Sequence, residues 1–196
     1  QNSAGLEKNN TANLTIDNAT NIAGKLIATG SEHGAGIGGG FGENFGGNCM
    51  NITISGGSVE AHSTNGAGIG GGGGFSNQYG GDCDTIIING GSVEAHSTNG
   101  VGIGGGNGKY YGGKCSNITI SGGSVNAQVG CTPHQNLDSS GSYDPKSPEV
   151  YLCVIPNTKT KSVAIDNKVW EPSNHKAVES CLLYTSPSPR DGLLSR

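Results

Sequence analysis

The sequence predicts an all-β protein whose main body is a parallel β-solenoid of about three to four coils. Three observations point to this fold class: a repeat of about 33 residues, short runs of β-branched residues, and a very high glycine content. Glycine makes up 37 of the 196 residues, whereas aromatic residues make up only 5%. A solenoid buries its core between successive coils, so a chain with few large apolar residues folds if each recurs at the same place.

The repeat consists of two segments that recur almost without change. The first, GAGIGGG, occupies residues 34–40 and 66–72 and, with valine in place of alanine, 100–106. The second, GSVEAHSTN, occupies residues 57–65 and 91–99. This regularity predicts that equivalent residues of successive repeats stack on one another.

Three cysteines keep the phase of the repeat, because Cys49, Cys83 and Cys115 follow one another at steps of 34 and 32 residues. Neighbouring coils are close enough for a disulfide, but parallel side chains make the torsion angle awkward. Three cysteines in a row also cannot all pair. We therefore expect buried free thiols here, while Cys131 and Cys153 are candidates to pair with each other.

Composition separates a β-solenoid from the helical repeats that share this period. Glycine costs about 1 kcal/mol at each position inside a helix, which excludes helical hairpins. Each repeat has one β-branched run followed by a glycine-rich turn, at residues 52–54, 86–88 and 118–120. Val59 and Ala61 alternate with polar residues, so one set points into the coil and the other outward. The inner ladders expected from the phase are Ile54, Ile88 and Ile120, and Ile37, Ile69 and Ile103.

Composition also divides the chain into four parts. Residues 1–130 hold the glycine-rich repeats, and residues 131–148, rich in Ser, Asp, Pro and Gly, have the composition of a linker. Residues 149–180 alternate apolar and polar side chains, which predicts a small, truncated β module. Residues 181–196 resemble a translated sequencing-adapter artefact and are left out of the functional interpretation. The chain begins with Gln1 and has no signal peptide, so we expect a fragment of a larger multidomain chain.

The repeats resemble a known group of proteins. The pattern NITISGGSVxA followed by GAGIGGG, within about residues 14–128, is similar to glycine-rich repeats of large secreted or surface proteins from gut-associated bacteria. The resemblance implies a secreted or cell-surface location and an adhesive or carbohydrate-binding role. The partner that it implies is a polysaccharide or a host glycan.

The charge pattern argues against several other classes of partner. The net charge is −4, and the arginines, Arg190 and Arg196, both lie near the C-terminal end, whereas binding phosphates requires clustered Lys and Arg. No apolar run approaches the roughly 20 residues that span a bilayer. The GxGxxG pattern at residues 34–39 matches a dinucleotide-binding fingerprint, but no helix is predicted after it to hold a pyrophosphate. We expect no cofactor, no nucleic-acid partner and no membrane span.

The aromatic residues of the repeats form the first candidate site. Phe45, Tyr79 and Tyr111 each lie four residues before a phased cysteine, so stacked coils would align them in a stripe. Flat rings suit the apolar faces of sugars. Alternatively, the rings pack over the glycine corners and close the end of the core. The predicted stripe consists of Phe41, Phe45, Phe75, Tyr79, Tyr110 and Tyr111.

A second candidate site lies on the outward face of the repeated segment. Glu60 and His62 lie two residues apart and recur as Glu94 and His96, so stacking would bring four possible ligands for zinc or copper together. The next coil offers Asn and Gln at these positions, which interrupts the array. The alternative interpretation is an exposed polar face.

These observations favour a binding module over an enzyme. Polysaccharide lyases and hydrolases with a β-helix need paired carboxylates, or a cation beside a metal-held uronate. The repeats contain no arginine and no carboxylate pair at an unrepeated position. We therefore expect a non-catalytic adhesive or carbohydrate-binding module. The alternatives are a structural spacer without a ligand and a fragment of a lyase or hydrolase.

Overall fold

The computed structural model describes residues 3–8, 11–19, 22, 24–74, 79–108 and 112–130, together with the backbone of short strands between residues 136 and 184. Every regular element in this part of the chain is a β-strand. None of its segments is a helix long and apolar enough to cross a membrane. The strands are β1 (Leu6–Glu7), β2 (Leu14–Ile16), β3 (Lys25–Thr29), β4 (Ile37–Gly38), β5 (Cys49–Ile54), β6 (Ser58–Ser63), β7 (Ile69–Gly70), β8 (Cys83–Ser97), β9 (Ile103–Gly104), β10 (Cys115–Gly130), β11 (Asn136–Leu137), β12 (Tyr143–Asp144), β13 (Val150–Val154), β14 (Val163–Ile165), β15 (Lys168–Trp170) and β16 (Leu182–Tyr184).

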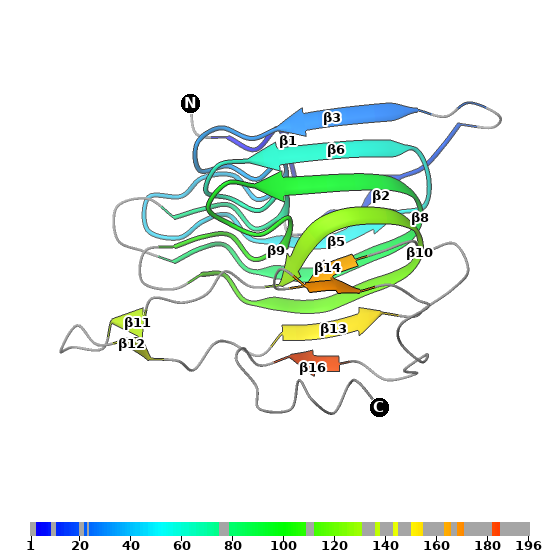
Figure 1. Ribbon diagram of the computed structural model, residues 1–196. Helices are drawn as coiled ribbons and strands as arrows, with labels where there is room; N and C mark the ends of the chain where they lie inside the picture. Colours follow the sequence, from blue (N-terminus) through cyan, green and yellow to red (C-terminus); the bar gives the residue numbers. More distant parts are fainter. Residues whose placement is uncertain are drawn as a thin grey trace.

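Each coil has three strand segments, and each segment pairs in parallel with its equivalent in the next coil. The first coil contains β1–β3, the second β4–β6, the third β7 and β8, and the fourth β9 and most of β10. The glycine face consists of β1, β4, β7, β9 and the end of β10. The isoleucine face consists of β2, β5 and the first parts of β8 and β10. The valine face consists of β3, β6 and the later parts of β8 and β10; Figure 1 shows β3, β6 and β8 as parallel arrows, one below another.

The register of these strands agrees with the phase of the repeat. On the isoleucine face, Ile88 lies opposite both Ile54 and Ile120, one in each neighbouring coil. On the glycine face, Ile69 lies opposite both Ile37 and Ile103. Both predicted ladders are therefore present, and the predicted parallel β-solenoid is confirmed.

The core is a column of isoleucine, valine and alanine side chains inside the coils. Val59 and Ala61 of β6 are fully buried, while Glu60 and His62, which alternate with them, are only half-buried. This is the predicted alternation of inward and outward side chains. The inward isoleucines are also fully buried, and each contributes about 1.5–3 kcal/mol of hydrophobic free energy.

The corner between the isoleucine and valine faces repeats with one backbone conformation. Gly57, Gly91 and Gly123 have φ angles of 81°, 82° and 83°, a region that glycine adopts without strain. The Gly-Gly pairs of the sequence therefore mark this corner in successive coils.

Near the end of β10 the chain passes from the valine face to the glycine face in fewer residues than in the earlier coils. Ala127 lies opposite Ala95, and Val129 lies opposite Ile103. One residue therefore turns a corner that takes seven residues, 96–102, in the preceding coil.

Strands beyond β10 extend two of the ladders. β13 pairs in parallel with β10 on the isoleucine face, and β14 pairs in parallel with the end of β10. The remaining pairs are antiparallel: β11 with β12 inside the predicted linker, β15 with β14, and β16 with β13. The division of the chain at residues 131, 149 and 181 stays a prediction.

Candidate functional site

The loops that join the glycine face to the isoleucine face carry exposed aromatic rings. In the second coil this loop spans residues 39–48, and Gly42 of this loop forms a parallel bridge with Gly74 of the third coil. Phe45 forms a parallel bridge with Tyr79. The Gly46 N–H donates to the Tyr79 carbonyl at 2.8 Å, and the Tyr79 N–H donates to the Asn44 carbonyl at 3.2 Å. The two loops therefore hold Phe45 and Tyr79 at equivalent positions.

The rings of Phe45 and Tyr79 stack on each other. Their centroids are 5.0 Å apart and their planes differ by 12°. Phe45 is 63% exposed and Tyr79 is 37% exposed, so this pair lies on the surface rather than over the core. A stack of this kind contributes about 0.5–1.5 kcal/mol beyond the area that it buries.

The other members of the predicted stripe divide into two groups. Phe41 is half-buried, and its ring packs beside the buried His33, with centroids 5.6 Å apart and a tilt of 49°. It therefore occupies surroundings different from those of Phe45, although the same loop carries both. Phe75, Tyr110 and Tyr111 lie outside the described residues.

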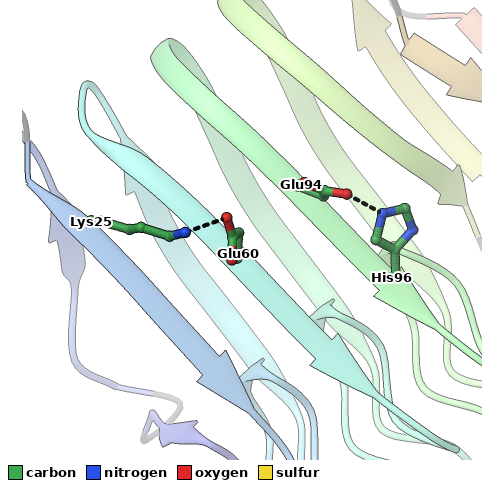
Figure 2. A network of polar contacts seen from close by, with 4 residues as sticks. All are labelled: Lys25, Glu60, Glu94 and His96. Carbon is green, nitrogen blue, oxygen red and sulfur yellow. Dashed lines mark hydrogen bonds and ion pairs between the residues drawn. The ribbon is translucent and has the colours of Figure 1, made fainter.

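The polar residues of the second candidate site share the outer surface of the valine face. Figure 2 shows Lys25 of β3 reaching Glu60 of β6, and Glu94 reaching His96 within β8. The Lys25 Nζ–Glu60 Oε1 distance is 2.7 Å, and the His96 Nε2–Glu94 Oε1 distance is 3.1 Å. The rings of His62 and His96 stack with their centroids 6.0 Å apart. The structure thus brings the four predicted residues onto one surface and adds Lys25.

Sequence reasoning missed Lys25 because the first coil has diverged from the repeat. Its valine-face strand reads KLIAT, whereas the next two coils read SVEAH at the same positions. The parallel register places Ile27 opposite Glu60, so Lys25 reaches the carboxylate diagonally. Aligning the inward residues Leu26 and Ala28 of the first coil with those of the next coil would have placed Lys25 on this surface.

The contacts of the four predicted metal ligands differ from those of residues in a protein metal site. Zinc and copper sites in proteins need three or four converging ligands. Within the part of the chain that the structure describes, no group of three or more His, Cys, Asp or Glu side chains is placed to hold a metal ion. Glu60 instead pairs with an ammonium group. The zinc or copper site stays a prediction.

The cysteine ladder lies inside the coil, on the isoleucine face. Cys83 lies opposite both Cys49 and Cys115, and all three are buried thiols outside any disulfide, as expected from the sequence. Burial raises the pKa of the Cys49 thiol to about 11, while the nearby Lys8 charge opposes this increase. A buried thiol with a raised pKa is chemically inert, so this ladder is part of the core.

Side chains in consecutive coils hold the ends of the aromatic loops in place. The Asn48 Oδ1 atom accepts a hydrogen bond from the Asp82 N–H at 2.8 Å. One coil later, the Asp82 Oδ1 atom accepts from the Lys114 N–H, also at 2.8 Å. Because Asn48 ends the loop that carries Phe45, this ladder fixes the position of the exposed pair relative to the solenoid.

The family described as Beta helix repeat matches residues 23–41, 52–73, 86–107 and 118–141. Three of these segments begin on the isoleucine face, at Ile52, Ile86 and Ile118. Over these segments the chain is similar to β-helix repeats, and its fold is a parallel β-helix. Comparisons of this β-helix with curated proteins and with solved structures gave no match. Because β-helix repeats occur in enzymes such as pectate lyases and also in proteins without catalytic activity, the fold alone assigns no activity.

Proposed function

We propose that this β-helix is a non-catalytic module of a secreted or cell-surface bacterial protein and that it binds carbohydrate. The observation that carries the proposal is the exposed stack of Phe45 and Tyr79. The loop that carries Phe45 contains several glycines, so few of its own side chains compete with a ligand for the ring surface. Aromatic rings in such surroundings suit the C–H faces of sugars, and the Tyr79 hydroxyl adds a hydrogen-bonding group.

The arrangement of carboxylates supports binding rather than catalysis. Glycoside hydrolysis uses two carboxylates that flank one bond. On the valine face, Glu60 pairs with Lys25, and Glu94 contacts His96. These carboxylates are therefore engaged with basic partners rather than arranged as an acid and a base around a substrate.

A glycan array with the full chain tests the proposal. We expect the wild-type protein to bind at least one plant or host polysaccharide, and the Phe45→Ala/Tyr79→Ala double variant to lose that binding while it stays folded. Ile27→Ala is a matched control, because Ile27 is 59% exposed but lies on β3 of the valine face. Equal binding by the wild type and the double variant would rule out the aromatic pair as the contact surface.

The second candidate function is a rigid spacer that holds other domains apart. The observation that favours it is the continuity of the polar and apolar ladders, which tie each described coil to the next. Absence of binding to every glycan on the array would favour the spacer. New reducing ends or unsaturated uronate products on incubation with polysaccharide would instead identify an enzyme.

A further inference from the structure

Two imidazole groups occupy directly opposite positions on the outer surface of the valine face. The parallel register pairs His62 of β6 with His96 of β8. Strands paired in this way lie about 4.8 Å apart, and the centroids of the two rings are 6.0 Å apart with planes that differ by 21°. The His96 side chain is 47% exposed and His62 is half-buried, so both rings are open to an ion from solvent.

The backbone beneath this histidine pair is held in place at the end of both strands. Ser63, which follows His62, donates its hydroxyl hydrogen to the Gly34 carbonyl at 2.8 Å. Ser97, which follows His96, donates in the same way to the Gly66 carbonyl at 2.6 Å. Each hydroxyl therefore ties the end of its strand to the turn of the preceding coil. A ligand that binds both rings meets a backbone that is already ordered.

A neighbouring carboxylate decides which nitrogen of His96 is available. Figure 2 shows Glu94 directed toward the His96 ring, and the Glu94 Oε1–His96 Nε2 distance is 3.1 Å. Because an ionised carboxylate only accepts hydrogen bonds, Nε2 carries the hydrogen and donates it. In the neutral ring this leaves the lone pair on Nδ1. A carboxylate on the second ring nitrogen is the usual partner of a histidine that binds a metal ion.

The charges around the histidine pair favour a cation. Glu60 lies opposite Glu94, and its carboxylate pairs with the Lys25 ammonium group at 2.7 Å. Asn126, which lies opposite Glu94 in the next coil, is uncharged. Since Lys25 and Glu60 neutralise each other, Glu94 supplies a net negative charge beside the two rings.

We propose that His62 and His96 together bind one copper(II) ion. Copper(II) has the highest affinity among the divalent first-row metals for nitrogen ligands, and it accepts imidazoles in a planar arrangement. The described residues hold no group of three or more potential metal ligands, so water fills the remaining positions. Thr29 lies opposite His62 on its other side, which limits the site to one ion.

Binding requires a movement of the side chains only. Metal–imidazole bonds are about 2.0 Å long, so one ion holds its two ligating nitrogens at most about 4 Å apart. The rings, with centroids 6.0 Å apart, reach this separation by tilting toward each other while the strands stay paired. The inference is independent of the carbohydrate binding proposed above, because the aromatic pair lies in the loops between the other two faces.

A copper(II) titration of the full chain tests the proposal. Affinity is measured by calorimetry, and the nitrogen ligands are counted by pulsed electron paramagnetic resonance. We expect one tightly bound ion with two imidazole ligands. His62→Ala and His96→Ala should each weaken binding at least tenfold, because either change leaves a single imidazole. His134→Ala/His175→Ala is the control, since both of these histidines lie outside the described residues, and it should keep the two-imidazole signal.

A second pair of variants tests the role of the carboxylate. Glu94→Gln should weaken copper binding about tenfold, because it removes the charge that orients His96. Lys25→Gln/Glu60→Gln is the matched control, since it removes the neighbouring ion pair without changing the net charge. This control should leave the affinity within about twofold of the wild-type value. Equal effects of the two changes would show that Glu94 does not position the ring.

The wild-type spectrum keeps the test independent of whether any variant folds. Absence of copper binding, or a spectrum with a single imidazole ligand, would overturn the proposal. It would also be overturned if folded His62→Ala and His96→Ala proteins bound copper as tightly as the wild type. None of these outcomes bears on the glycan array.

Discussion

Thr85 lies one coil beyond Asn51, and both residues hold the backbone in the left-handed region, at φ angles of 55° and 61°. Asn117 repeats this conformation in the next coil, at 52°. Asparagine adopts left-handed backbone angles at little cost, whereas a β-branched residue is strained there. Thr85 is thus the member of this ladder whose side chain conflicts with its backbone.

Replacing Thr85 by asparagine should therefore stabilise the protein. We expect Thr85→Asn to raise the free energy of unfolding by about 1 kcal/mol, measured by urea denaturation. Thr53→Asn is the control, because Thr53 lies in an extended part of β5 where asparagine gains nothing. A Thr85→Asn protein no more stable than the wild type would show that the left-handed conformation is not strained.

Glycine at the end of β7 is required by the backbone of the next coil. Gly70 has a φ of 140°, and an added Cβ atom would lie 1.9 Å from the Gly104 carbonyl oxygen. We expect Gly70→Ala to destabilise the protein by about 3 kcal/mol or more, because no flexible side chain is available to move aside. Gly24→Ala is the matched control, since nothing lies within 4 Å of its added Cβ atom. Comparable thermal midpoints for both variants would contradict the close approach of these strands.

The isoleucine ladder should be sensitive to the loss of a single methylene group. Ile86 is fully buried between Ile52 and Ile118 of the neighbouring coils. We expect Ile86→Val to lower the free energy of unfolding by about 0.5–1.5 kcal/mol. The same change at the exposed Ile27 should alter it by less than about 0.5 kcal/mol. Chemical denaturation of the two variants in parallel measures the difference, and equal effects would be inconsistent with a packed ladder.

The buried Cys49 thiol should make stability fall at high pH. Burial raises its pKa from 9.0 to about 11, so the folded protein holds this proton more tightly than the unfolded chain does. This contribution is complete below pH 9 and is lost as the pH rises toward 11. Between these pH values the wild type should lose on the order of 2–3 kcal/mol more than Cys49→Ala. Parallel pH profiles for the two proteins would show that the thiol does not titrate in this way.

Sequence reasoning predicted the solenoid because the periodicity that builds it is written in the chain. The fixed spacing of Ile54, Ile88 and Ile120 predicted one inner ladder, and the phase of the cysteines predicted another. The alternation around Val59 and Ala61 predicted which side chains are buried. Each of these features depends only on residues that recur in every coil, so stacking the repeats places them without knowledge of the loops.

The tertiary structure alone decided how the exposed side chains meet. The stacking of Phe45 on Tyr79, the separate position of Phe41 and the Lys25–Glu60 pair all depend on loop length and coil register. A repeat fixes the core because inward residues have one position to fill, whereas surface contacts follow from the differences between neighbouring coils.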